Sequence, residues 1–409
     1  MWKLIKTLSI STDLIIKIFI AFFIWENLQN LNIIAIFGLI YFATLPFGSL
    51  ISGIIGEQIN PKIPFIAAFL IQIIQISTIL RLQYNINMET VMLIGMLGGL
   101  GEGLKSVAGS YIDFSIRQET DKSKFYAKKT FVTQLLNLFM PMVAALLVTV
   151  TGEYNLLFMS ILVLLIIQSG LLAISKIPTI RNTFDLDEIL KIPGTNKDKP
   201  ILIKGIFIEG LEDSITRTIL PIIILVMVGS ILNWGLINSA LVVISIAASY
   251  LISSLIKDNY SQVLYALFSM IFAAISMIFL VRYDFFLVLL FLIFLSLMEI
   301  VKGTSYYSTL DKIIEEDKKG YQLYPEYKFL EDLVASLARV LPLIAIIVFG
   351  IGFENGITIR LLLLYVGSIP LLTISLLGRS RIFNINYKEE MTINSARKEN
   401  LPSLDPNRS

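Results

Sequence analysis

Ionisable side chains of opposite charge recur three or four residues apart inside long apolar stretches of this sequence. The pairs are Asp13 and Lys17, Glu102 and Lys105, Asp213 and Arg217, and Glu299 and Lys302. Residues at these spacings share one face of an α-helix, so we expect each helix to pair its own charges and to point them inward. A carboxyl group in such surroundings can exchange a proton near neutral pH, and a cationic side chain can bind an anionic or polar solute.

Two interpretations of these charges are open. In the structural one, the pairs only neutralise each other and hold helices together. In the functional one, they line a polar cavity. The proton-coupling candidates are then Glu102, Glu299, Asp213 and Asp13. The substrate-binding candidates are Lys17, Lys105, Arg217 and Lys302. We expect Glu102 and Glu299 to lie deepest, and a charge at the bilayer centre costs about 2.5–3.5 kcal/mol on insertion scales.

The composition excludes several other kinds of chemistry. The 409 residues include no Cys and no His, which removes disulfides, thiolate nucleophiles, imidazole metal ligands and His-dependent triads. A phosphate-binding loop is also excluded, because Leu104 separates Gly103 from Lys105 in the only similar stretch. We therefore expect no catalytic residue, no metal site and no cofactor, and we do not expect an enzyme.

The charges lie in apolar segments that are long enough to cross a membrane. The chain is 56% apolar with a mean hydropathy of +0.78, and its apolar runs are about 20 residues long, as a hydrocarbon core of about 30 Å requires. The segments are 5–27, 33–55, 62–83, 91–114, 129–150, 154–175, 204–228, 231–255, 260–281, 284–309, 330–350 and 357–378. They predict an all-α integral membrane protein with twelve transmembrane helices. Glycines in 91–114 favour close helix packing or a flexible point.

The two halves of the chain repeat each other at a shift of about 200 residues. The corresponding charges are Asp13 with Asp213, Lys17 with Arg217, Glu102 with Glu299, and Lys105 with Lys302. Six spans per half make the repeats parallel, an architecture that places a substrate site between the halves near the midplane. We predict six-helix bundles at 1–175 and 204–378, a linker at 176–203 and a disordered tail at 379–409.

Lys and Arg are distributed unevenly between the two sides of the predicted spans. They gather in the N-terminal segment, in every second connection and in the tail. The connections on the other side hold only Arg81 and Arg282, with Arg360 at a helix start. Segments rich in Lys and Arg stay in the cytoplasm. We therefore predict a multi-pass protein of the cell membrane (plasma or inner membrane) with both termini in the cytoplasm.

In these features the chain resembles the major facilitator superfamily. Between its second and third spans that family carries a signature of the type Gly-x-Leu-Ala-Asp-Arg-x-Gly-Arg-Lys. The sequence keeps Gly53, Glu57 as the acid and Lys62 as the final base, whereas Gln58 replaces the Arg and Asn60 the second Gly. The resemblance implies that the retained residues act as a cytoplasmic gate.

The resemblance also implies a function, and Asp258 would join the gate from the equivalent loop of the second half. It implies secondary active transport of a small solute by alternating access, coupled to protons, with spans one, four, seven and ten around the cavity. The expected partners are the small-molecule substrate, protons and the lipid bilayer, with no nucleic acid, and the expected state is a monomer. The alternatives are a transporter-like receptor or scaffold without turnover and a polytopic lipid-handling membrane enzyme.

Overall fold

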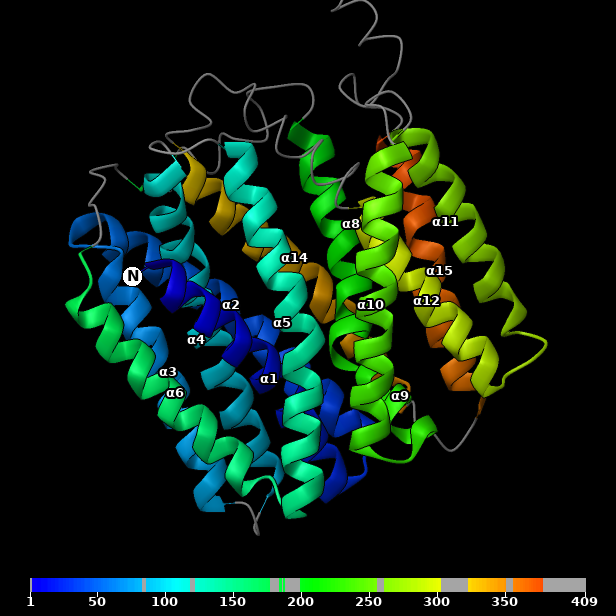
Figure 1. Ribbon diagram of the computed structural model, residues 1–409, viewed down its shortest axis with the longest axis horizontal. Helices are drawn as coiled ribbons and strands as arrows, with labels where there is room; N and C mark the ends of the chain where they lie inside the picture. The colour runs from blue at the N-terminus through cyan, green and yellow to red at the C-terminus, as the bar shows by residue number, and fades with distance from the viewer. Residues whose placement is uncertain are drawn as a thin grey trace, which may run out of the picture.

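The computed structural model describes residues 2–82, 86–117, 122–176, 184–185, 187, 199–255, 261–302, 323–350 and 356–377. These residues form α-helices and short turns, and no strand occurs among them. Figure 1 shows the helices of the first half on the left and most of those of the second half on the right, with α14 reaching across toward α2.

The first half contains six helices in its described residues. They are α1 (Trp2–Leu28), α2 (Leu31–Gln58), α3 (Lys62–Leu82), α4 (Met88–Arg117), α5 (Lys122–Thr151) and α6 (Asn155–Ile174). The helices α4 and α5 extend beyond the apolar segments predicted at 91–114 and 129–150. The reason is that the length of an apolar segment reflects the thickness of the hydrocarbon core. The polar residues that flank the segment can continue the helix beyond it.

The described residues of the second half form seven helices. They are α8 (Lys199–Thr218), α9 (Leu220–Val228), α10 (Ile231–Leu255), α11 (Ser261–Ile278), α12 (Phe285–Lys302), α14 (Tyr324–Val348) and α15 (Gly356–Leu377). The single span predicted at 204–228 is therefore wrong in one detail, because it is divided into α8 and α9. Pro221 stands in the first turn of α9, and proline neither donates a backbone hydrogen bond nor fits against the preceding turn.

Counting α8 and α9 as one crossing gives twelve spans in the described part of the chain, as predicted. Eight of its helices are long and apolar enough to cross a membrane by length and composition. The helices α8 and α14 fall outside that set because both carry several charged side chains. These two charged helices are therefore the ones that most need a polar environment inside the molecule.

Two helix pairs make the most extensive contacts between the halves. The helix α14 packs along α2 and also contacts α4, while α10 packs along α5. Under the internal repeat α2 corresponds to α10 and α5 to α14, so the two contacts are equivalent. The end of α2 and the start of α8 lie on one side of the molecule, called here the linker face. The turns after α1, α5 and α9 lie on the opposite side, called the hairpin face.

Glycines set how closely α2 and α4 approach each other. A Cβ atom on Gly103 would lie 2.1 Å from the backbone oxygen of Leu45, and one on Gly48 would lie 2.4 Å from that of Leu100. Both distances are shorter than any normal contact, so only glycine fits at these crossings. This close packing, typical of small residues between membrane helices, places Glu102 of α4 directly beside α2.

Candidate functional site

A cavity of about 230 Å³ lies between the two halves. Its walls come from α2 and α4 of the first half and from α8 and α14 of the second. The lining residues are Leu45, Glu102, Ser106, Ile206, Glu209, Arg217, Lys328, Glu331, Asp332, Ala335 and Arg339. A smaller lobe of about 50 Å³ shares Glu102, Arg217 and Arg339 with it and adds Lys17 of α1 and Tyr41 of α2.

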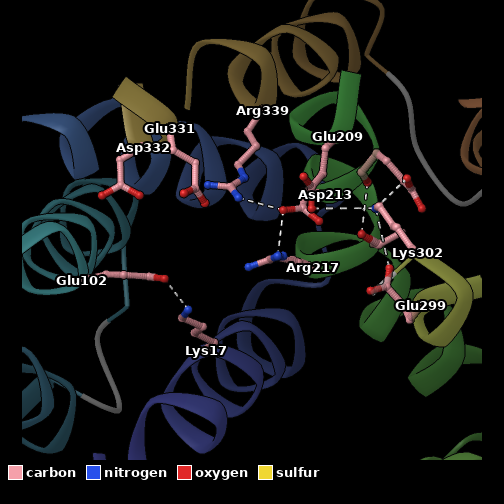
Figure 2. Close-up of polar contacts among 12 residues, drawn as sticks. Lys17, Glu102, Glu209, Asp213, Arg217, Glu299, Lys302, Glu331, Asp332 and Arg339 are labelled. Atoms are coloured by element: carbon pink, nitrogen blue, oxygen red, sulfur yellow. Dashed lines mark hydrogen bonds and ion pairs between the residues drawn. The ribbon is translucent and has the colours of Figure 1, made fainter. Parts of the chain in front are cut away.

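Glu102 and Lys17 form an ion pair that joins α4 to α1 at the edge of the cavity. Figure 2 shows the two side chains extending toward each other. The hydroxyl of Tyr41 donates to the other carboxylate oxygen of Glu102. Both charged side chains remain partly exposed, at 37% for Lys17 and 28% for Glu102. A carboxylate and a cation are thus available to a solute in the same lobe.

Asp13 and Lys105 form a second pair, within the first half. The Nζ atom of Lys105 lies 2.7 Å from Oδ1 of Asp13, which also accepts a hydrogen bond of 2.9 Å from Gln72. Neither Asp13 nor Lys105 lines the cavity. The prediction that each helix pairs its own charges is therefore wrong for the first half. Spacing shows only which residues share a face, whereas a long Lys side chain reaches the carboxylate of a neighbouring helix.

Asp213 of α8 is shared by two guanidinium groups. Its Oδ2 atom lies 2.8 Å from Arg217, four residues further on, and 2.7 Å from Arg339 of α14. Here the predicted pairing within one helix does occur. The guanidinium of Arg339 also lies over the ring of Phe42, 5.2 Å from its centre. Arg339 is therefore held by contacts from both halves, at the boundary between the two lobes of the cavity.

Lys302 of α12 is surrounded by three carboxylates. Its Nζ atom lies 3.1 Å from Glu212, 3.8 Å from Glu299 and 3.9 Å from Glu209. The expectation that Glu299 lies deepest is wrong, because its side chain is 54% exposed while that of Glu212 is 4% exposed. Among the described residues, α12 lines neither lobe of the cavity. Spans two and eleven contribute instead of the tenth.

A stripe on α14 supplies five cavity residues that the sequence analysis did not select as candidates. Lys328, Glu331, Asp332, Ala335 and Arg339 all line the cavity. Their spacing of three and four residues is that of one helix face. The apolar segment predicted to start at 330 placed Lys328 in a connection, whereas the other four residues lay inside the predicted span and were not selected. A search for i, i+4 patterns that continue past the apolar boundary would have found it.

The proposed gate is only partly visible in the described residues. Lys62 donates to backbone carbonyls at the end of α6, among them that of Ser175 at 2.9 Å. Gly53 lies at the contact between α2 and Phe184, whose ring atoms a Cβ on Gly53 would meet at 2.5 Å. The side chain of Glu57 and all of Asp258 lie outside the described residues. The gate therefore stays a prediction.

Contacts between the halves lie on both sides of the cavity. Toward the linker face, the hydroxyl of Ser49 on α2 donates to Asp332 on α14 at 2.6 Å. Toward the hairpin face, the ring of Phe22 on α1 meets Trp234 of α10 with centroids 4.8 Å apart. The halves are thus in contact on both sides of the cavity.

Comparison with known proteins identifies the fold. No family model matches the sequence, and no curated protein matches it. The solved structure of the nucleoside transporter NupG is 12% identical over 93% of this chain and 99% of its own, with a TM-score of 0.62. A mutant form of NupG gives 13%, 91% and 98%, with a TM-score of 0.63. A mutant of the E. coli fucose:proton symporter FucP gives 12%, 92% and 97%, with a TM-score of 0.54.

These likenesses cover nearly the whole of each chain and therefore define the fold class. The protein has the major facilitator fold, an all-α arrangement of two six-helix repeats. The predicted fold class is confirmed. Together with the apolar helices, it makes the chain a multi-pass membrane protein.

Proposed function

We propose that the chain is a secondary active transporter that moves a small solute by alternating access and couples this movement to protons. The observation that carries the proposal is the charged cavity between the halves, where α1, α2, α4, α8 and α14 meet. In transporters built from parallel repeats, the substrate site lies at the interface of the repeats. NupG is described as a nucleoside transporter and FucP as a fucose:proton symporter, and both share this fold.

Glu102 is the proposed coupling group, because it lines both lobes of the cavity and pairs with a cation there. A proton on its carboxylate removes the charge that holds Lys17, so Lys17 becomes available to the solute. Loss of the proton restores the pair once the solute has left. The fixed contacts of Asp213 position Arg217 and Arg339, and Asp13 positions Lys105. Asp213 and Asp13 are therefore assigned a supporting role rather than a coupling role.

The proposal also covers the location of the protein, its oligomeric state and its non-enzymatic role. The distribution of Lys and Arg favours a protein of the cell membrane with both termini in the cytoplasm. Function as a monomer is proposed, because the cavity is formed by the two halves of one chain. A non-enzymatic role is proposed from the fold shared with transporters.

The test uses the full-length protein in liposomes that contain a pH-sensitive dye. Amino acids, peptides, sugars, nucleosides and organic anions are added outside, and a solute that is carried with protons changes the internal pH. The same solute should accumulate when an inward proton gradient is imposed. We expect Glu102→Gln to abolish the proton signal while solute exchange without a gradient continues. Glu153→Gln, in the exposed turn between α5 and α6, is the matched control and should behave as the unmodified protein.

Two results would contradict the proposal. If no solute class moves while several bind, the chain is a receptor or scaffold with a transporter fold. If Glu102→Gln and Glu299→Gln both keep the proton signal and its pH dependence, the coupling group is another residue.

A further inference from the structure

One residue of the connection between the halves packs against both of them. Phe184 belongs to the predicted linker 176–203, and its ring is partly buried against the core. The ring touches α2 at Gly53, where a Cβ atom would lie 2.5 Å from two ring carbons. The same ring meets that of Phe329 on α14, with centroids 6.0 Å apart and planes at 78°. Phe184 therefore fills a space between α2 of the first half and α14 of the second.

This packing extends the contact between the halves that Ser49 and Asp332 make at 2.6 Å. On α2, Gly53 follows Ser49 by four residues. On α14, Phe329 precedes Asp332 by three residues. Residues at these spacings share a helix face. Because α2 ends on the linker face (Figure 1), Phe184 lies about one helical turn further toward that face than the contact of Ser49 with Asp332.

A second contact holds this part of the linker on α14. The backbone N–H of Asp185 donates to Oε1 of Glu326 at 3.2 Å, and Glu326 is only 1% exposed. The N–H of Asp187 donates to Oδ1 of Asp185 at 2.8 Å, which is the hydrogen bond of an Asx turn and fixes the direction of the chain after Phe184. Phe184 is thus attached to α14 through its own ring and through the residue that follows it, whereas it meets α2 at a glycine.

Gly53 provides the space that the ring occupies. Any larger residue would place its Cβ atom 2.5–2.9 Å from three ring atoms, so the ring would have to move away. The family resemblance assigns Gly53 to a cytoplasmic gate, and the contact with Phe184 gives this glycine a physical role there.

We infer that Phe184 is a gating residue that closes the cavity toward the linker face. Its ring bridges α2 and α14 while this side is closed. When the halves separate here, the ring leaves Gly53 and stays on α14 with Phe329. Exposure of the ring to water is unfavourable, so Phe184 stabilises the state that is closed toward the linker face. The inference rests on the proposed alternating access and adds the linker to the contacts that must open.

A purely structural role for Phe184 would have a different consequence. A residue that only anchored the linker would lower the stability of the fold when removed, without favouring either orientation of the cavity. A gating residue stabilises one orientation, so its removal shifts the population toward the state that is open to the linker face. The side from which the cavity becomes accessible therefore distinguishes the two roles.

The test measures access to the cavity from each side of the membrane in the full-length protein. The chain has no cysteine, so Ser106→Cys in the cavity wall provides a single thiol. A membrane-impermeant maleimide is added to inside-out and to right-side-out vesicles. Asp187→Cys, at an exposed position of the linker, shows in a separate variant which vesicles present the linker face. Phe184→Ala should raise labelling of the cavity thiol from that face at least about fivefold, as loss of an aromatic contact implies, and should not raise it from the hairpin face.

Two further variants make the test decisive. Gly53→Ala should displace the ring and raise labelling from the linker face as Phe184→Ala does, and it decides alone should Phe184→Ala fail to fold. The double variant should label no faster than either single one, because both changes act on the same contact. Phe286→Ala is the matched control, since Phe286 is 76% exposed at the start of α12, and it should label at the unmodified rate. Unchanged labelling in both test variants, or an equal rise from both faces, would overturn the inference.

The outcome is distinguishable from failure of the proposed function, because labelling requires no solute. A rise confined to the linker face, without flux of any solute in liposomes, would support the gating role of Phe184 and contradict transport. Proton-coupled flux of a solute, with labelling unchanged in the test variants, would overturn the inference and leave the transporter proposal standing.

Discussion

In the first half of this protein, the charges inside the spans are held by pairs that cross from one helix to the next. Lys105 is only 8% exposed and bonds to Asp13, whereas Lys17, on the same helix as Asp13, turns to Glu102. The structural and functional interpretations of the charges thus apply to different pairs. Asp13 and Lys105 stabilise the first half away from the cavity, and Lys17 and Glu102 face it.

Removing the carboxylate of Asp13 should destabilise the protein strongly. In Asp13→Asn the ammonium of Lys105 remains buried without its ionic partner, and the loss of one member of a buried pair costs about 3–5 kcal/mol. The double variant with Lys105→Met should recover much of this loss, because no buried charge is left. Free energies of unfolding in a detergent titration provide the measurement, and an Asp13→Asn protein as stable as the unmodified one would contradict the assigned role.

Asp284 provides a pH-dependent contribution outside the spans. It accepts a hydrogen bond of 3.0 Å from the backbone of Leu287 at the start of α12. That bond and the ion pair with Arg282 hold the pKa of Asp284 below its usual value. A lowered carboxyl pKa means that the stabilisation is present above the unfolded value of about 3.9 and is lost as the pH falls through the folded value.

Asp284→Ala should therefore lower the melting temperature at neutral pH, and the difference from the unmodified protein should shrink in acid. Melting curves at a series of pH values test this. A difference that grows on acidification would mean that the native state holds the carboxyl in its neutral form.

The sequence predicted which residues are charged inside the spans, but it did not predict most of their partners. The i, i+4 spacing of Asp213 and Arg217 gave a correct contact, whereas the same spacing failed for Asp13 and Lys17. The difference arises from neighbouring helices, because the rotation of α4 brings Glu102 within reach of Lys17. Helix rotation depends on packing over the whole bundle, which a local spacing does not contain.

At the scale of elements, the contact between α2 and α4 depends on the absence of side chains at its crossings. Gly103→Val would place a Cβ atom 2.1 Å from the backbone oxygen of Leu45. Backbone atoms cannot move aside as a flexible side chain can, so the two helices must separate. We expect a loss of at least about 1–3 kcal/mol, the range for overpacking, and weaker solute binding because Glu102 moves with α4.

Gly170→Val in α6 is the matched control for this variant. No heavy atom lies within 4 Å of the Cβ position at Gly170, so the substitution should leave stability nearly unchanged. Unfolding titrations of the two variants compare the same chemical change at a packed and an open position. Equal effects would mean that the α2–α4 crossing is not tightly packed.

Element boundaries were predicted where apolarity changes sharply and missed where it does not. The ends of α6 follow the predicted segment 154–175 closely. The break between α8 and α9 lies inside one apolar run, where only Pro221 marks it. The start of α14 at Tyr324 lies in a charged stretch, so hydropathy placed it too late. For the same reason Lys328, which lines the cavity, was assigned to a connection.

At the scale of the whole molecule, the two halves touch on either side of the cavity, and alternating access requires these contacts to open in turn. Ser49 and Asp332 make such a contact toward the linker face. The chain has no cysteine, so a pair introduced at these positions reacts without background. We expect Ser49→Cys with Asp332→Cys to form a disulfide under mild oxidation and to stop solute flux, with recovery on reduction.

The control pair lies on the same helix but within one half. Ser52 accepts a hydrogen bond of 3.0 Å from the backbone of Ala108 on α4, so Ser52→Cys with Ala108→Cys links α2 to α4 without joining the halves. Because each half moves as a unit in a rocking transition, this disulfide should leave flux intact. Continued flux through the protein cross-linked between Ser49 and Asp332 would mean that the halves do not separate there, and that the solute takes a path that never opens the linker face.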